Sequence, residues 1–262
     1  MSKDILVTII GDDVFARDWM SLLLVRDWRT RVVSEITSQD DFNAFKHDGM
    51  QKVDFLLVDL DSLATQPALI SNILDDDAIP QPAKLLLVGT SLDAKAFKSI
   101  PSQLFAGYLL KDEILSSLAW AITFAAEGST VFTPSTLDFA YQLNFPVPEN
   151  KIVLKSHHIP GLTDRQTDIA KLAIIFSIGR RDLADELKIS DQWSYGMVSE
   201  LYTKLGLSDI FDGSVDAYRY MENDEVIKAH IKDILEDLGT SKKARDVETL
   251  AFHLLTMPSI EN

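Results

Sequence analysis

The chain has 262 residues, of which 46% are hydrophobic and 25% are charged, so it is long enough for two folded units and is neither disordered nor fibrous in composition. Its formal net charge is −15, which argues against nonspecific binding to nucleic acid, because phosphate binding needs Lys and Arg. The absence of Cys excludes disulfides, thiolate metal sites and cysteine nucleophiles, and it fits the reducing cytoplasm in which we expect the protein to act.

The first part of the chain alternates short apolar runs with segments of helical spacing. The first run, ILVTII, is too short for a signal peptide or a membrane span, so no membrane association is expected. Such nearly continuous apolar runs are typical of parallel strands that are covered on both faces. Five strands are predicted, at residues 5–10, 31–36, 55–60, 84–90 and 107–110. Segments 15–27 and 113–128 have helical spacing, and Gly128 is expected to cap the second. The sequence therefore predicts a doubly wound, five-stranded parallel α/β domain over residues 1–127.

Residues 128–160 differ from the segments on either side. They contain four prolines and carry two basic and two acidic residues. We interpret them as a linker that packs through its aromatic side chains. Helical periodicity returns at Leu162 and continues to the end of the sequence. This predicts an all-α domain over residues 161–210, followed by extra C-terminal helices over residues 211–262.

Polar side chains follow the predicted strands. Asp12 and Asp13 come directly after the first strand and Asp59 ends the third, so we expect these three carboxylates to converge at one edge of the sheet. Converging carboxylates need a counter-charge, and Mg²⁺ is the usual one for all-oxygen ligands. Thr90 after the fourth strand and Lys111 after the fifth add a hydroxyl and an ammonium. Together these groups predict a site for a phosphoryl group, with metal bound to the acids, one carboxylate as the nucleophile, and the hydroxyl and ammonium holding the added oxygens.

In this order and spacing, the motifs GDD, FLLVDLDS, LLLVGTS and GYLLKDE resemble those of a response-regulator receiver domain, over residues 4–127. The resemblance implies that Asp59 accepts a phosphoryl group from a sensor histidine kinase and that Asp12, Asp13 and Asp59 hold Mg²⁺. It also implies that Thr90 and Tyr108 form a conformational switch. The alternative is that the acids only cap strand ends, in a domain that has kept its shape and lost its regulation.

One position departs from the pattern of the family. The family usually has Met-Pro and then a Gly after the phosphoacceptor, whereas here Asp59 is followed by Leu-Asp-Ser. Asp61 is thus an extra acid near the pocket, which would repel the Asp59 carboxylate or strengthen metal binding. We expect the Asp61 side chain to be solvated.

Residues 161–210 resemble the LuxR-type helix-turn-helix that follows receivers in the NarL/FixJ class. The matching motifs are LTDRQ for the opening, DLADELKIS for the support helix and turn, and YTKLGL for the exit. Ser190 is predicted to cap the reading helix. The resemblance implies a regulator of transcription that binds DNA through this helix under the control of phosphorylation at Asp59.

The reading helix lacks the hydroxyls and cations that the family has there. Where the family commonly has Thr, Val, Lys, His and Asn, this helix has Trp193, Ser194, Tyr195, Met197 and Glu200, and Gly196 lowers helix stability. The candidate DNA contacts are Arg180, Arg181, Gln192, Trp193, Ser194, Tyr195 and Lys204. Three interpretations stay open: a rebuilt DNA-reading face, an exposed apolar patch for a protein partner, or a tryptophan that packs into the core of its own domain.

The last segment contains two amphipathic stretches, at 225–239 and 244–257, which predict a helical hairpin. We consider four roles for it: a homodimerisation element, a cap over the reading helix, a docking site for a partner, or extra core. The sequence has no Ser/His/Asp relay, glycine-rich phosphate loop or zinc pattern, so we expect a regulator and not an enzyme.

Overall fold

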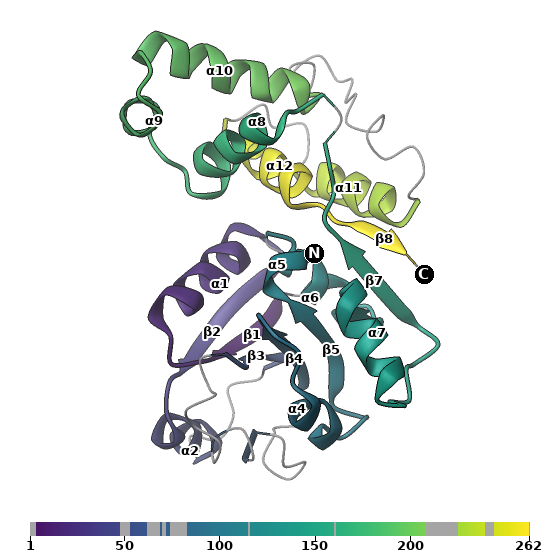
Figure 1. The fold of residues 1–262 in the computed structure, drawn as a ribbon. Helices are drawn as coiled ribbons and strands as arrows, with labels where there is room; N and C mark the ends of the chain where they lie inside the picture. Colours follow the sequence, from purple (N-terminus) through teal and green to yellow (C-terminus); the bar gives the residue numbers. More distant parts are fainter. Residues whose placement is uncertain are drawn as a thin grey trace. The chain divides into compact units, whose positions relative to one another are not determined.

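The structure of the chain is a computed structural model (Figure 1). It describes residues 4–47, 53–61, 69, 72–73, 83–114, 116–159, 161–207, 225–238 and 244–261. The chain folds into two compact units, an α/β unit of Met1–Ser156 with Pro258–Asn262, and a helical unit of His157–Met257. The helical unit is therefore an insertion in the α/β unit.

A single sheet organises the α/β unit. In the described part of the chain, eight strands pair in the order β2-β1-β3-β4-β5-β6-β7-β8. All neighbours are parallel except β7 and β8, which are antiparallel. The strands are β1 (Ile5–Ile10), β2 (Thr30–Ile36), β3 (Phe55–Asp59), β4 (Lys84–Gly89), β5 (Phe105–Leu110), β6 (Thr130–Phe132), β7 (Lys151–Lys155) and β8 (Ser259–Glu261).

Helices cover both faces of this sheet. Phe42 of α2 and Phe97 of α4 lie in one buried cluster with Leu56 and Val58 of β3, and α7 packs against the same cluster. The intervening Leu57 is also buried and points to the opposite face, because strand side chains alternate. On that face α1 contacts β1, β2 and α6. The helices of this unit are α1 (Val14–Arg26), α2 (Gln39–His47), α4 (Ala94–Ser99), α5 (Lys111–Ile114), α6 (Leu118–Ala126) and α7 (Pro134–Gln142).

The five predicted strands are present and parallel, but the prediction of a five-stranded sheet is wrong. Strands β6 and β7 extend the sheet beyond β5, and β8 returns from the far end of the chain to pair with β7. The predicted helix at 113–128 is divided into α5 and α6, and Gly128 has the left-handed backbone expected after a helix end.

The interpretation of residues 128–160 as a linker is also corrected. This segment contains β6, α7 and β7, and Val131 and Phe132 are fully buried. Pro134 occupies the first turn of α7, where proline costs no hydrogen bond. The Phe145 ring packs edge-on against Phe97 with centroids 4.5 Å apart. Residues 130–155 thus form a folded βαβ extension of the sheet.

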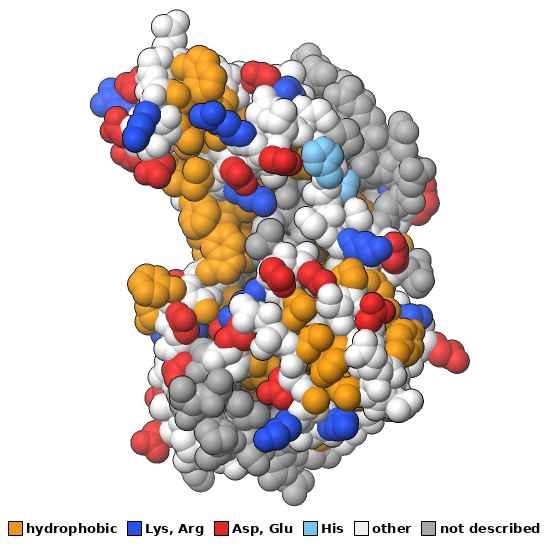
Figure 2. Space-filling view, viewed as in Figure 1, with side chains coloured by type: hydrophobic (Ala, Val, Ile, Leu, Met, Phe, Trp, Pro, Cys, Tyr) orange, Lys and Arg blue, Asp and Glu red, His pale blue; other side chains and the backbone are white. Residues whose placement is uncertain are grey.

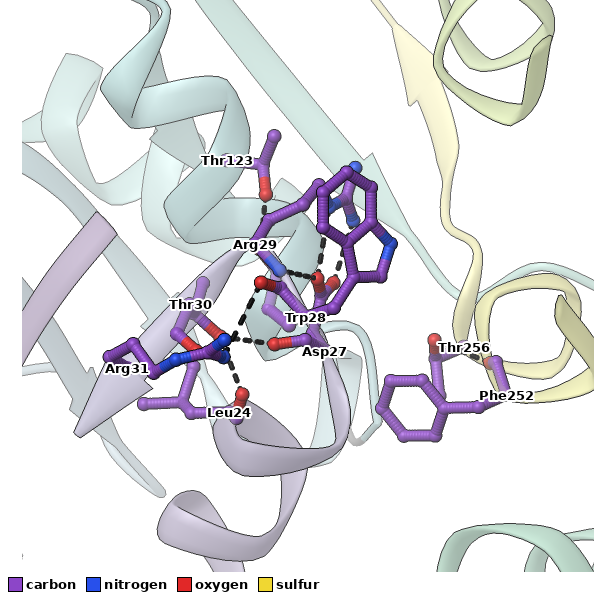
Figure 3. A network of polar contacts seen from close by, with 10 residues as sticks. Leu24, Asp27, Trp28, Arg29, Thr30, Arg31, Thr123, Phe252 and Thr256 are labelled. Carbon is purple, nitrogen blue, oxygen red and sulfur yellow. Dashed lines mark hydrogen bonds and ion pairs between the residues drawn. The ribbon is translucent and has the colours of Figure 1, made fainter. Parts of the chain in front are cut away.

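A buried ion pair fixes the start of β2 (Figure 3). Arg29 donates through Nε and Nη2 to the two oxygens of Asp27, at 3.0 and 2.7 Å. The Asp27 side chain is fully buried, and the Arg29 guanidinium lies 4.6 Å from the centre of the Trp120 ring. This pair lies at the amino end of β2, away from the strand ends at which the candidate site residues stand.

The helical unit contains the predicted helix-turn-helix. Lys188 adopts a left-handed backbone in the turn after α9, and the Ser190 side chain accepts the Trp193 amide at the start of α10, as predicted for an N-cap. The elements of this unit are α8 (Asp164–Ala170), the π-helical turn η3 (Lys171–Ile175), α9 (Arg180–Leu187), α10 (Asp191–Lys204), α11 (Glu225–Leu238) and α12 (Ala244–Thr256).

The two predicted C-terminal helices are present as α11 and α12. Ile227, Ile231 and Ile234 of α11 are buried, and α12 contacts both α11 and η3. This packing favours extra core as the role of the hairpin. None of the helices in the described ranges is both long and apolar enough to cross a membrane.

Candidate functional site

The strand ends bring three predicted site residues together. Asp59 ends β3 and its side chain is only 1% exposed. Lys111 begins α5 directly after β5, and its ammonium lies 2.7 Å from Asp59 Oδ1. Thr90 follows β4, which lies between these two strands. A carboxylate, an ammonium and a hydroxyl therefore meet at the carboxyl edge of the sheet, where open α/β folds place their sites.

Asp61 links Lys111 to Thr90. Its carboxylate accepts hydrogen bonds from the Thr90 amide at 2.9 and 2.8 Å and from the Thr90 hydroxyl at 2.9 Å. It also lies 2.9 Å from the Lys111 ammonium. The Asp61 amide donates to Asp59 Oδ1 at 3.2 Å, so the turn after β3 folds this side chain back over the pocket. The expectation that Asp61 is solvated is wrong, since four donor contacts hold it.

These contacts change the acidity of both partners. Burial raises the pKa of the Asp61 carboxyl, but hydrogen bonds from the Thr90 amide, Lys111 and the Thr90 hydroxyl outweigh it, so the pKa lies below its ordinary value. Burial lowers the pKa of Lys111, while the two carboxylates raise it above its ordinary value. The site therefore holds one ammonium between two carboxylates.

Tyr108, predicted to be part of the switch, is fully buried on β5. Its hydroxyl donates to the Ser91 carbonyl at 2.7 Å and accepts the Asp93 amide at 3.0 Å. Burial raises the pKa of Tyr108 to about 12. Because Ser91 follows Thr90 directly, these hydrogen bonds tie the loop that carries the Thr90 hydroxyl to β5.

The extension of the sheet helps to position Lys111. The Glu113 carboxylate accepts hydrogen bonds from the amide and the hydroxyl of Ser135, which lies in the first turn of α7. The Thr136 hydroxyl donates to the Tyr108 carbonyl at 2.6 Å. Residues that were predicted to be a linker thus anchor α5 and β5 beside the site.

The Mg²⁺ site at Asp12, Asp13 and Asp59 stays a prediction, and in the structure two of these carboxylates contact other groups. Asp13 instead caps α1, where its Oδ1 accepts the Phe15 and Ala16 amides at 2.8 and 3.1 Å. Asp59 faces the Lys111 ammonium. Among the residues that the structure describes, no group of three or more His, Asp or Glu side chains is arranged to hold a metal ion.

A second cation fixes the loop after β1. Arg17 is buried, and it donates to the Gly11 carbonyl at 2.9 Å and to Glu35 at 3.0 Å. Burial raises the pKa of the Glu35 carboxyl, but hydrogen bonds from Arg17 and Ser21 outweigh it and leave the pKa lowered. These contacts hold Asp12 and Asp13 at the surface, where both are exposed.

The reading helix α10 presents aromatic side chains. Trp193 and Tyr195 are each 54% exposed, so the interpretation of Trp193 as a core residue is wrong. Ser194 is fully buried and donates to the Arg180 carbonyl at 2.7 Å, which removes it from the candidate DNA contacts. The exposed face of α10 also carries Gln192, Gly196 and Glu200.

Most of the nearby cations already have partners within the unit. The Arg180 guanidinium stacks 5.2 Å from the centre of the Tyr195 ring and donates to the Tyr195 carbonyl. The Lys204 ammonium lies 3.1 Å from Glu200 and 3.1 Å from Gln166. Arg181 is exposed, with its Nε 3.9 Å from Asp191. Figure 2 shows hydrophobic side chains between blue and red side chains over α9 and α10.

A groove of about 640 Å³ lies beside these side chains, between α8 and α10. Its apolar lining comes from Ile169, Trp193 and Met197, and Arg165 and Glu200 stand at its polar part. A Cβ added to Gly196, which lines the same groove, would meet no atom within 4 Å. The groove is thus open where the helix lacks a side chain.

Two features were missed from the sequence. The sequence indicates Asp61 as an extra acid near the pocket, but it does not indicate the contacts of Asp61 with Thr90 and Lys111. Ser194 was placed on the exposed face, although it shares helical spacing with Met197, Val198 and Leu201, which are all buried.

No protein-family model and no curated protein matches the sequence. Solved structures do match. The response regulator ChrA of a heme-sensing two-component system is 21% identical, with a TM-score of 0.40 over 84% of this chain and 98% of that one. RcsB, in a structure of two RcsB dimers bound to two parallel DNAs, is 13% identical, with a TM-score of 0.44 over 85% of this chain and 100% of the RcsB chain. The signal receiver domain of the putative response regulator NarL from Mycobacterium tuberculosis is 20% identical, with a TM-score of 0.39 over 48% of this chain and 98% of that domain. All three of these proteins are described as response regulators, and each of them is less than 25% identical to this chain.

Proposed function

We propose that the chain is a response regulator in which Asp59 accepts a phosphoryl group from a histidine kinase and the helical unit carries the output. The observation that carries this proposal is the meeting of Asp59, Lys111 and Thr90 at the carboxyl edge of the sheet. The Asp59 carboxylate is the nucleophile, while the Lys111 ammonium and the Thr90 hydroxyl are donors for the oxygens of the added group.

The contacts around Thr90 support a route by which phosphorylation of Asp59 would change the conformation of the α/β unit. A phosphoryl group on Asp59 would draw the Thr90 hydroxyl toward its oxygens. Ser91 would move with Thr90, and the Ser91 carbonyl is the acceptor for the buried Tyr108 hydroxyl. A change at Asp59 would therefore alter the packing of β5 and of the segments bonded to it.

The experiment is phosphorylation of the full chain by acetyl phosphate in a magnesium-containing buffer, measured by intact mass. One added phosphoryl group is expected on the parent chain and none on Asp59→Asn. Asp112→Asn is a matched control, because Asp112 is an exposed acid next to Lys111, and it should be phosphorylated like the parent. An Asp59→Asn chain that gains the same mass would contradict the assignment.

For the output, we propose that α10 binds a protein partner. This is supported by the exposure of Trp193 and Tyr195 beside the apolar groove, and by the partners that Arg180 and Lys204 already have. Tyr and Trp contribute large contact area at protein interfaces, whereas an acidic rim weakens phosphate binding. The partner would insert an apolar side chain between Trp193 and Met197.

A photo-crosslinking amino acid in place of Trp193 tests this output in cells. Protein adducts are expected from that position and not from Val226, an exposed apolar position on α11 that serves as the control. Equal adducts from both positions would show that exposure alone explains the contact.

DNA binding is the second candidate, and a specific observation favours it. The helix α9, the turn at Lys188 and the Ser190 cap present Gln192 and Tyr195 at the start of α10, with Arg180 and Arg181 beside them. Binding to native promoter fragments over a range of salt concentrations tests it. Loss of Arg181 should then lower the slope of log affinity against log salt by about one. No shift with any fragment would exclude this candidate.

A further inference from the structure

Three donors around Thr90 and Lys111 form a small site for an anion. They are the Thr90 amide, the Thr90 hydroxyl and the Lys111 ammonium, and we call them the anion seat. All three lie within 2.9 Å of an oxygen of one carboxylate, which belongs to Asp61. Such charge-assisted hydrogen bonds are stronger than neutral ones. The chain therefore fills this seat with its own anion.

We propose that the Asp61 carboxylate is an internal ligand that competes with the phosphoryl group, so that Asp59 is phosphorylated only when Asp61 leaves the anion seat. This rests on the proposed role of Asp59 as the phosphoacceptor. In the reaction with acetyl phosphate, an Asp59 oxygen attacks the phosphorus, the bond from phosphorus to the acetyl oxygen breaks, and acetate leaves with the electron pair. The phosphoryl oxygens then need the donors that Asp61 now occupies.

The position of Asp61 makes it a strong competitor. It is tethered two residues from Asp59, and its amide donates to Asp59 Oδ1 at 3.2 Å, so its effective concentration at the seat is high. Asp59 is covered, with a side chain only 1% exposed, whereas Asp61 and Lys111 above it are 29% and 27% exposed. An ideal Cβ on Gly89 of β4 would lie 3.5 Å from Asp61 Oδ1, so the carboxylate also lies close to the end of that strand.

The same contacts hold the switch loop in the unphosphorylated chain. Asp61 binds both the amide and the hydroxyl of Thr90, and Ser91 next to it accepts the Tyr108 hydroxyl. Thr90 is thus already bonded to an anion before any phosphoryl group arrives. Asp61 sets the threshold for phosphorylation and limits how much the loop changes when phosphorylation occurs.

The test compares initial rates of phosphorylation by acetyl phosphate in full-length parent, Asp61→Ala, Asp61→Asn and Asp112→Asn chains. Loss of the competing carboxylate should raise the rate about tenfold or more in Asp61→Ala, because several charge-assisted hydrogen bonds no longer have to break first. Asp61→Asn keeps the size and loses the charge, so a smaller increase is expected. Asp112→Asn removes a nearby charge that makes no contact with the seat, and it should match the parent.

A second readout needs no phosphoryl group. Amide hydrogen exchange at Thr90 should be faster in unphosphorylated Asp61→Ala than in the parent, because the acceptor of that amide is gone, and unchanged in Asp112→Asn. Equal phosphorylation rates in the parent and Asp61→Ala would overturn the competition and leave Asp59 as the acceptor. Uptake of phosphate by none of the chains would overturn the proposed function itself, and the competition with it.

Discussion

The Tyr108 hydroxyl donates a 2.7 Å hydrogen bond to the Ser91 carbonyl, which joins the buried face of β5 to the loop after β4. Tyr108→Phe removes this bond and the acceptor of the Asp93 amide. We expect the free energy of unfolding at pH 7 to fall by about 1–3 kcal/mol, as measured by denaturant titration.

The same substitution has a distinct signature at high pH. The pKa of Tyr108 is raised from 10.0 to about 12 in the folded chain, so its contribution to stability is complete below pH 10 and is lost as the pH rises through 12. The stability difference between parent and Tyr108→Phe should therefore shrink between pH 10 and 12. A difference that stays constant over this range would contradict the burial of the hydroxyl.

Close contact between β5 and β6 gives a second prediction. A Cβ added at Gly107 would lie 2.1 Å from the Val131 carbonyl oxygen, which is backbone and cannot rotate away. Gly107→Ala should lower the free energy of unfolding by about 3 kcal/mol in thermal or denaturant unfolding. Gly128→Ala is the matched control, since its Cβ meets no atom within 4 Å and only the left-handed backbone is penalised, by about 1 kcal/mol.

The buried ion pair of Asp27 and Arg29 gives a third prediction. Arg29→Met takes away the bidentate partner of a fully buried carboxylate, and we expect a loss of about 3–5 kcal/mol in denaturant unfolding. Lys232→Met breaks an ion pair on the exposed side of α11 and should cause no measurable loss. Similar losses in both variants would mean that the pair at β2 is not desolvated.

Gly196 gives a fourth prediction, which separates stability from binding. Gly196→Ala should stabilise the chain by about 1 kcal/mol, because α10 gains a better helix former and the added methyl meets no atom. The methyl also enters the groove beside Trp193, so cross-linking from position 193 to a partner should become weaker. A variant that is more stable and cross-links as well as the parent would place the partner elsewhere.

The sequence was enough to predict the parallel strands of the core and the helices of the helix-turn-helix. Short, nearly continuous apolar runs at 5–10, 55–60 and 84–90 predict strands of a covered sheet, and the type of residue 190, a Ser before the reading helix, predicts its N-cap. The extension was not predicted, because β6 and β8 have three residues each and β7 follows a segment that contains Pro146 and Pro148. The pairing of β6 with β5 depends on the bare backbone of Gly107, which no local pattern indicates.

The chemistry at the strand ends was predicted in part. The residue types at Asp59, Thr90 and Lys111 pointed to one edge of the sheet, and the strand order brings them there. The role of Asp61 was missed because an acid after a strand is equally compatible with solvent. Only the conformation of the turn, which directs the Asp61 amide to Asp59 and the Asp61 carboxylate to Thr90, distinguishes a bound Asp61 from a solvated one.

The most direct test of the central claim is to locate the phosphoryl group after treatment with acetyl phosphate. Reduction of the acyl phosphate by borohydride converts the modified aspartate to homoserine, which peptide mass spectrometry can assign to a position. The account predicts homoserine at position 59 and unmodified Asp61. Homoserine at position 61, or at neither position in a chain that has gained a phosphoryl group, would contradict it.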